Sequence, residues 1–235
     1  MKIKGSGIYT DANGKNQRIL GVGELSDDEK LQELKVSGNI SFDKILCNEV
    51  RLSGKFKGGS ISAQDLKISG GLSFDDISCE EADISGKCEG KSISAENFSV
   101  SGKIEIDSLT IGQTLKLSGR PKINSATANE IFLGASDGFV GEIKCRNLKI
   151  FKGTVSFGGE IFGKNFFENF LFNESNSRIH VKKIEAEKIA LENCAADVIK
   201  CKDAFIGSNC AIEKLFVAGE CKVAADSTVS ETIRI

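Results

Sequence analysis

The chain has 235 residues, of which 40% are hydrophobic and 27% charged, and its formal net charge at pH 7 is −2. This composition is ordinary for a folded soluble protein, and the near-neutral charge gives no global attraction to nucleic acid. The N-terminus lacks the apolar core of a signal peptide and no run of eighteen apolar residues occurs, so we expect neither a secretory leader nor a transmembrane helix.

The chain contains eight cysteines but no CxxC pair. Cys194, Cys201, Cys210 and Cys221 lie 7, 9 and 11 residues apart, which is neither a metal-ligand spacing nor a typical disulfide framework. Buried, reduced thiols that pack as small hydrophobic side chains are the simplest interpretation. Reduced thiols predict a cytoplasmic protein.

Glycine recurs along the chain at steps of 16 or 17 residues, beginning near the N-terminus. From Gly38 onward, each of these glycines follows a serine, and an aliphatic residue stands two positions before it. The glycines are Gly5, Gly21, Gly38, Gly54, Gly70, Gly86, Gly102 and Gly119. A repeat of this length decides the fold and is therefore considered before any single motif.

Within one period, small or apolar residues come in pairs two positions apart. Between Gly54 and Gly70 the pairs are Phe56 and Gly58, Ile61 and Ala63, and Leu66 and Ile68. A spacing of two places both members of a pair on one face of a strand, whereas helical spacings of three and four do not fit. Each period therefore predicts a coil of three short strands with six inward side chains, and serine-glycine occupies the widest corner.

The same template fits Ile40 to Leu52, Leu72 to Ile84, Ile104 to Leu117, Ile179 to Ile206 and, with a widened corner, Cys210 to Val223. The predicted fold is an all-β, three-sided parallel β-helix, or solenoid, with 16–17-residue coils and about thirteen coils in total. In one inward position Phe42, Gly58, Phe74 and Gly90 alternate between large and small. Coils about 4.8 Å apart leave no room for a phenyl ring at every level, so the glycines are expected to accommodate the rings.

Two regions interrupt the repeat. Residues 22–33 are expected to hold a short surface helix capped by Ser26. Residues 151–172 are longer than one coil and contain seven of the fifteen phenylalanines. We therefore divide the chain into a regular β-helix at 1–150, a Phe-rich irregular coil at 151–172 and a continuation of the same β-helix at 173–235. The Phe-rich coil either packs on the rod or forms an apolar contact surface through Phe162, Phe166 and Phe167.

Convergent catalytic groups are not evident in the sequence. The single histidine, His180, lies between inward Ile179 and Val181 and should point outward, so a histidine-based triad or multi-histidine metal site is excluded. We predict no catalytic residues, no metal and no cofactor. A surface cluster of carboxylates, as in polysaccharide-cleaving β-helices, stays open as a less favoured alternative.

One outward row is basic and contains Lys35, Arg51 and Lys67, then Lys116 and Lys149, with Asp83 and Ser99 interrupting it. Such charges ordinarily keep a strand surface solvated and discourage unwanted pairing. Contact with an anionic membrane or polymer is the functional alternative for this row.

The ends of a solenoid expose strand edges and an apolar cross-section unless they are capped. At the N-terminus Ile3, like Ile19, is expected to sit in repeat register, and the chain finishes with a strand-like run around Val229, Ile233 and Ile235. We expect these five residues to mediate self-association, because uncapped ends favour end-to-end stacking.

The recurring aliphatic-x-aliphatic-Ser-Gly unit, together with the opening Ile3-Lys4-Gly5-Ser6-Gly7, resembles the bactofilins, the polymer-forming bacterial cytoskeletal proteins. The resemblance covers mainly residues 1–135. It implies a right-handed β-helix that polymerises through its terminal coils without nucleotide. It also implies a cytoplasmic location, often at the membrane, and scaffolding of cell-envelope proteins. The bactofilin core is usually about half as long as this solenoid, and a Phe-rich break is atypical of it.

Three functions follow from these observations. The first is a self-assembling cytoskeletal scaffold whose partner is another copy of itself. The second is an adaptor that does not polymerise and that binds a partner along its side, through the Phe-rich coil and the basic row. The third is a carbohydrate-acting β-helix enzyme, which requires a surface groove with clustered carboxylates.

Overall fold

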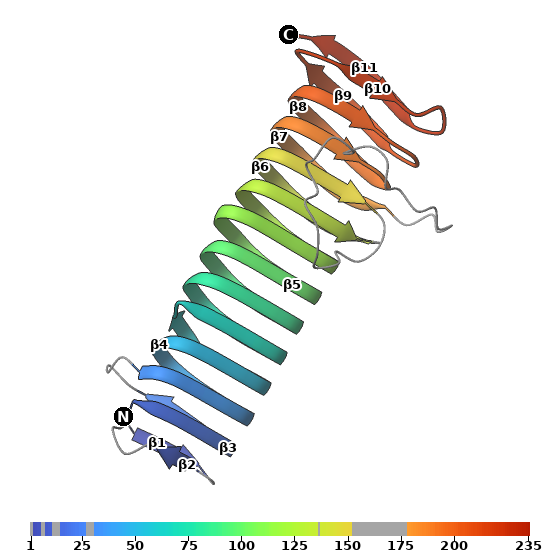
Figure 1. Ribbon diagram of the computed structural model, residues 1–235. Helices are drawn as coiled ribbons and strands as arrows, with labels where there is room; N and C mark the ends of the chain where they lie inside the picture. The colour runs from blue at the N-terminus through green and yellow to red at the C-terminus, as the bar shows by residue number, and fades with distance from the viewer. Residues whose placement is uncertain (1, 6–7, 11–14, 27–30, 136, 152–177) are drawn as a thin grey trace.

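The computed structural model describes the chain except for residues 1, 6–7, 11–14, 27–30, 136 and 152–177 (Figure 1). The described residues form strands joined by turns, and none of them is helical. The strands are β1 (Lys2–Gly5), β2 (Ile8–Thr10), β3 (Asn16–Ser26), β4 (Leu31–Ser62), β5 (Asp65–Ala135), β6 (Gly138–Phe151), β7 (Ile179–Leu191), β8 (Cys194–Ile206), β9 (Ala211–Val217), β10 (Cys221–Val223) and β11 (Thr228–Arg234).

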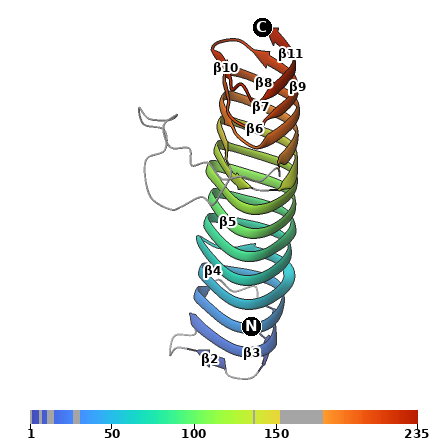
Figure 2. The same ribbon diagram turned by 90° about the vertical axis from the view of Figure 1, so that its right-hand side faces the viewer.

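The strands from β3 onward wind into a right-handed solenoid of about 11 turns, which confirms the predicted fold class (Figure 1). The long strands β4, of 32 residues, and β5, of 71 residues, each follow the rod around two coils or more (Figure 2). Neighbouring coils pair in parallel with the shift that the sequence repeat predicts. Asn16 pairs with Glu33, a shift of 17, and Glu49 pairs with Asp65, a shift of 16.

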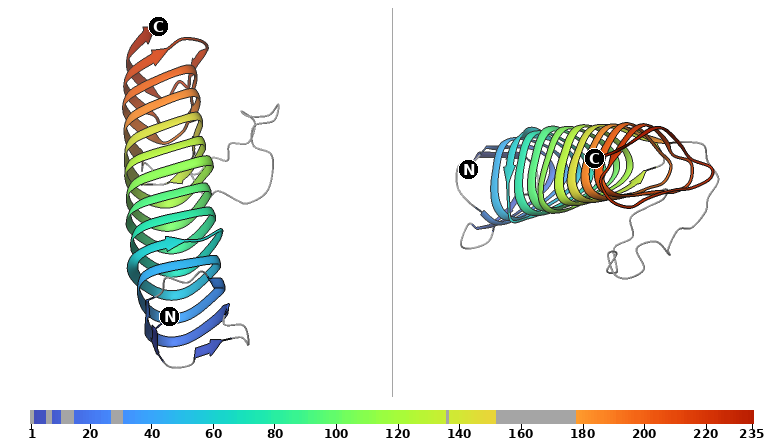
Figure 3. Two further views of the ribbon diagram at one scale, coloured as in Figure 1. Left: turned by 90° about the vertical axis from the view of Figure 1, so that its left-hand side faces the viewer. Right: turned by 90° about the horizontal axis from the view of Figure 1, so that it is seen from above.

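Each coil has three pairing segments, as the three residue pairs per period predicted. Between β6 and β7 the ladder covers 138–140, 142–145 and 147–150, with a corner residue left unpaired between segments. The three segments form the three sides of one coil. Each segment of a coil lies over the same segment of the preceding coil, so the coils stack along the rod (Figure 3).

The inward side chains form one continuous apolar core along the rod. Ile61 and Ile77 pair in register, and each is at most 2% exposed. The residues from Ile40 to Leu117 and from Ile179 to Val217 that the repeat assigned to the interior are buried, apart from five that are half-buried: Gly58, Ala63, Cys79, Gly90 and Ala186. Val223 departs from the pattern, because it is 45% exposed although it pairs in register with buried Ile206.

The serine-glycine corner requires glycine for a steric reason. Gly54 has φ of 133°, and a Cβ atom on it would collide with the carbonyl oxygen of Gly38 one coil below. The same backbone conformation recurs at Gly38, Gly70, Gly86, Gly102 and Gly119. Other corners use asparagine in the left-handed region: Asn193 has φ of 51° and Asn209 has φ of 56°. Those two side chains bond to each other across the coils, with Asn209 Nδ2 donating to Asn193 Oδ1 at 2.8 Å.

The alternation of phenylalanine and glycine in the core is confirmed. A Cβ atom on Gly58 would collide with the Phe42 ring and backbone, and one on Gly90 would collide with the ring of Phe74. Both rings are at most 5% exposed. A glycine above each ring therefore keeps successive coils at their normal spacing.

The solenoid continues in register across the Phe-rich region. Gly138 of β6 pairs with Ile179 of β7, a shift of 41 residues instead of 16 or 17, and the parallel ladder runs on to Ile150 and Leu191. Strands β7 to β11 therefore extend the same parallel ladder beyond β6. The irregular coil itself lies almost wholly outside the described residues.

Two local predictions near the N-terminus are wrong. Residues 22–26 and 31–33 are strand, so a helix over 22–33 does not form, and residues 27–30 lie outside the described residues. Ile3 is not in parallel register either, because β1 runs antiparallel to β3 and pairs Ile3 with Leu25. Strand β2 is also antiparallel to β3. The first strands therefore form no coils of their own, which is one reason why about thirteen coils was too high a count.

We expect Gly90→Ala to lower the free energy of unfolding by about 1–3 kcal/mol, because the added methyl group overpacks against the Phe74 ring. Gly71→Ala is the matched control. Its Cβ would meet only the Lys55 side chain, at 3.9 Å, so its effect should stay within about 0.5 kcal/mol. Urea unfolding of both variants measures the difference, and equal stabilities would show that the alternation is not a packing requirement.

Candidate functional site

The predicted basic row lies along the third segment of successive coils. Lys35 pairs in register with Arg18, and Arg51 pairs with Lys67, so the four cations stand in one outward column. Two positions further along each strand, serines form a second outward column. A groove with a volume of about 580 Å³ runs between the columns; it is lined by the four cations and by Ser37, Ser53, Ser69, Ser85 and exposed Leu20.

A third column on the same face is acidic, and it neutralises the basic one. Glu33, Glu49 and Asp65 stand two positions before Lys35, Arg51 and Lys67, and the column continues at Glu81, where Asp83 takes the place of a cation. Lys35 Nζ lies 2.5 Å from Glu33 Oε1, and Arg51 Nε donates to Glu49 Oε1 at 2.6 Å. The face is therefore striped with opposite charges and is not a basic patch.

A second groove, with a volume of about 350 Å³, overlaps the next coils of this face. Its lining includes the carboxylates of Asp65, Glu81 and Asp83 and the cations Lys67 and Lys116. This is the kind of carboxylate-lined groove that the enzymatic alternative requires.

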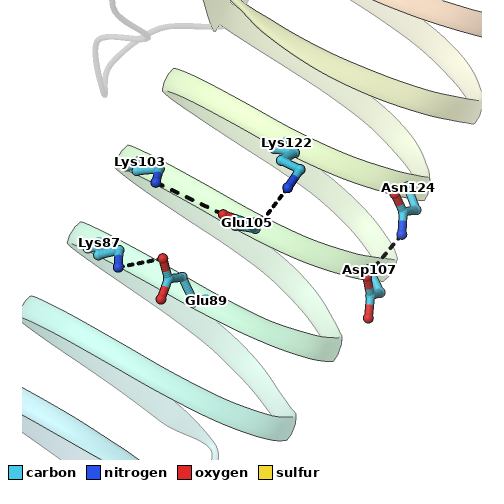
Figure 4. Close-up of polar contacts among 7 residues, drawn as sticks. All are labelled: Lys87, Glu89, Lys103, Glu105, Asp107, Lys122 and Asn124. Carbon is cyan, nitrogen blue, oxygen red and sulfur yellow. Dashed lines mark hydrogen bonds and ion pairs between the residues drawn. The ribbon is translucent and has the colours of Figure 1, made fainter.

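Ion pairs also connect coils on the face of the first segment (Figure 4). Lys122 Nζ lies 2.5 Å from Glu105 Oε1 of the preceding coil, and Asn124 Nδ2 donates to Asp107 Oδ1 at 2.9 Å. The lysine lowers the pKa of the Glu105 carboxyl, first through this hydrogen bond and then through its charge. These side chains are largely exposed, so the pairs contribute little each to stability.

At the C-terminal end, the apolar columns of the core stop and polar residues replace part of them. Thr232 pairs in register with buried Leu215, and Arg234 pairs with buried Val217. Arg234 Nη1 also donates to the carbonyl oxygen of Gly219. Strand β11 therefore has polar side chains, Thr232 and Arg234, at two positions that are apolar in the preceding coil.

Apolar side chains nevertheless remain accessible at this end. Val229 pairs with buried Ile212 but is itself half-buried, and Val223 and Ile235 are 45% and 57% exposed. Ile233 pairs with Phe216, a half-buried residue between two inward positions, so its side chain faces outward and not into the core column. We call Val223, Val229 and Ile235 the end patch.

The N-terminal end is different. Ile19 is 0% exposed, and β2 pairs with β3 directly at that residue. An antiparallel strand thus lies along the edge of the first coil at the point where Ile19 would otherwise meet solvent. Of the five predicted end residues, the structure places three at the C-terminal end, buries Ile19 and moves Ile3 onto an antiparallel strand.

The remaining candidate residues behave as follows. His180 is half-buried and points outward, and its Nε2 lies 2.7 Å from Asp197 Oδ1. Within the described part of the chain, no cluster of three or more histidine, cysteine or acidic residues could hold a metal ion. Phe162, Phe166 and Phe167 lie outside the described residues.

All eight cysteines are free, and none is fully exposed. Burial raises the pKa of Cys88, Cys145 and Cys201 to about 12 and that of Cys47 and Cys210 to about 11. A thiol with such a pKa stays protonated at neutral pH and is a poor nucleophile. These five cysteines therefore act as packing residues.

Sequence reasoning found the basic column but missed the acidic column beside it, although both have the same period. The signal was present as an acidic residue two positions before each cation, at Glu33, Glu49 and Asp65. The polar ending of the core was also missed, because the register of β11 depends on a turn of irregular length after β10.

No protein-family model, curated protein or solved structure matches the chain. The resemblance to bactofilins therefore stays a prediction. In the residues that the structure covers, no helix has the length and apolar character needed to cross a membrane.

We expect the cysteines of the folded chain other than Cys221 to react slowly with a thiol-specific reagent at pH values well below 11, because burial keeps them protonated and shielded. After unfolding in denaturant, all eight should react rapidly. Time-resolved titration with a chromogenic disulfide reagent measures both rates. Rapid labelling of most cysteines in the folded chain would contradict their placement in the core.

Proposed function

We propose that the protein is a structural scaffold that associates with further copies of itself through its C-terminal end. The observation that supports this proposal best is the difference between the two ends. Ile19 is covered in the first coil, whereas Val223, Val229 and Ile235 remain accessible at the last ones. A solenoid of stacked coils is also the architecture expected of a rigid spacer or cytoskeletal element.

Backbone pairing supports the same contact. Strand β11 pairs with β9, and β10 pairs with β8; among the described residues, neither has a partner on its other side. A second copy can supply hydrogen bonds to these edges and cover the end patch at the same time. Hydrogen bonds between the strand edges of two copies stabilise the association beyond what burial of the end patch gives. They supply partners to backbone groups that the contact would otherwise bury unpaired.

The symmetry of this contact limits what it builds. Two copies that meet by their C-terminal ends use the same surface twice, which gives a closed pair and not an open chain. Growth beyond a pair therefore needs a second contact, at the N-terminal strands or along the sides of the rod. The bactofilin-like polymer predicted from the sequence depends on that second contact.

We expect the double variant Val223→Asp and Val229→Asp to lose end-to-end association, because two carboxylates in the end patch repel their counterparts and disfavour desolvation. Ala225→Asp with Ser230→Asp is the control, since it adds the same charge at exposed positions of the same end. Sedimentation velocity and negative-stain electron microscopy, without nucleotide, give the readout.

The unmodified chain should sediment as a pair or larger assembly with rods joined at one end, and the control should behave likewise. The patch variant should sediment as a monomer with an unchanged circular dichroism spectrum. Monomers of the unmodified chain at high protein concentration would refute the proposed function.

Carbohydrate cleavage is the second candidate, because Asp65, Glu81 and Asp83 line one groove. We expect no activity, and we propose that the carboxylates serve only as surface charge. Incubation with neutral and uronate polysaccharides, followed by measurement of new reducing ends, tests this. Activity that disappears in both Glu81→Gln and Asp83→Asn would establish an enzyme instead.

A further inference from the structure

One face of the rod carries two neighbouring columns of opposite charge. The acidic column consists of Glu33, Glu49, Asp65 and Glu81, and the basic column consists of Arg18, Lys35, Arg51 and Lys67. Both lie on the third segment of consecutive coils, two residues apart along each strand. Three consecutive coils carry both charges, as Glu33 with Lys35, Glu49 with Arg51 and Asp65 with Lys67. Asn16 stands beside Arg18 and Asp83 beside Glu81, so the striped face is these three coils with a cation at one end and carboxylates at the other.

Stacking like charges is unfavourable in each column considered alone. Charges in successive coils are about 4.8 Å apart, and like charges directly opposite each other destabilise a sheet. Contacts within a strand relieve part of this repulsion, as between Lys35 and Glu33 and between Arg51 and Glu49. The side chains of these four residues nevertheless keep between 29% and 49% of their surface exposed, so they retain room for a second set of partners.

We propose that the striped face docks against the striped face of a second copy, with the two rods side by side and parallel. A twofold axis along the rods places the acidic column of each copy over the basic column of the other. A twofold axis across the rods places acidic over acidic and basic over basic. Charge complementarity therefore selects the parallel arrangement and also fixes the lateral register.

The shape of the face suits this partner. The coils lie over one another along a straight rod, so both columns stay aligned over their length (Figures 1 and 3). The column beside the cations consists of serines, which are short and leave the cations accessible from above. Two such faces can approach to the separation of about 10 Å that is typical of packed sheets.

A second copy fits the charges better than an anionic polymer or membrane does. Every cation from Lys35 to Lys67 has a carboxylate two residues before it, so a polyanion over the basic column would also meet the acidic one. Another striped face satisfies both columns at once. Exposed ion pairs are individually weak, so we expect weak association that falls as salt rises.

This lateral contact uses a different surface from the end-to-end contact of the proposed function. The test is therefore made in a chain that already carries Val223→Asp and Val229→Asp. Association that remains in this background and depends on salt is lateral. Failure of the lateral contact then leaves the end-to-end contact untouched, and the reverse is also true.

Two triple variants reverse one column each. Lys35→Glu, Arg51→Glu and Lys67→Glu make both columns acidic in the three coils that carry both charges, whereas Glu33→Lys, Glu49→Lys and Asp65→Lys make both columns basic in the same coils. We expect each variant alone to sediment as a monomer at low salt and their equimolar mixture to form a pair. Combining all six changes in one chain should restore self-association, because the stripes are then exchanged.

A matched control changes three lysines on the face of the first segment: Lys87→Glu, Lys103→Glu and Lys122→Glu (Figure 4). This variant has the same net charge as the acidic triple variant and should pair like its parent. Circular dichroism and thermal melting identify any variant that fails to fold. A monomeric parent at low salt, or a mixture of the two triple variants that stays monomeric, would overturn the proposal.

Cross-linking tests the orientation. In parallel rods, Glu49 of one copy faces Arg51 of the other, so Glu49→Cys chains mixed with Arg51→Cys chains should form disulfides faster than either chain alone. The buried native thiols react slowly, and the half-buried Cys221 is changed to serine in both chains so that it does not compete. Faster self-linking of Glu49→Cys would mean that acidic columns face each other and would overturn the parallel arrangement.

Discussion

The structure depends on one spacing, the distance of about 4.8 Å between hydrogen-bonded coils. The backbone sets this distance, so six inward side chains must fit the same thin layer in every coil. The rings of Phe42 and Phe74 extend into the layer of the next coil. Glycine stands at the facing positions, Gly58 and Gly90, because a Cβ atom there would collide with the rings. The corner glycines meet the same requirement, since the carbonyl below Gly54 leaves no space for a Cβ atom. The sequence repeat is the consequence of this spacing.

Because the same layer recurs, much of the fold could be predicted from the sequence. Residue pairs such as Ile61 and Ala63 have the period of a strand, and the step from Gly54 to Gly70 gives the length of a coil. The ends could not be predicted in the same way. Antiparallel pairing of Ile3 with Leu25 and the register of Arg234 over Val217 depend on turns that no neighbouring coil repeats.

The candidate surfaces were predicted less completely than the core, again for a physical reason. Inward residues are constrained by contacts on all sides, whereas an outward residue such as Lys35 is constrained only by its neighbours in one column and along one strand. The function of such an outward residue can be inferred only together with the residues of the adjacent column. Glu33 turns an apparent basic row into a striped face, and the partner that best suits such a face changes accordingly.

Strands β6 and β7 pair with a shift of 41 residues in place of 16 or 17, and the ladder on either side keeps its register. Lengthening a connection costs entropy only slowly, and each coil contacts only its neighbours, so nothing elsewhere has to adjust. The connection between β6 and β7 is thus a natural attachment point for engineering. A foreign domain grafted there would be held at a defined height along the rod, and assembled rods would display it at regular intervals.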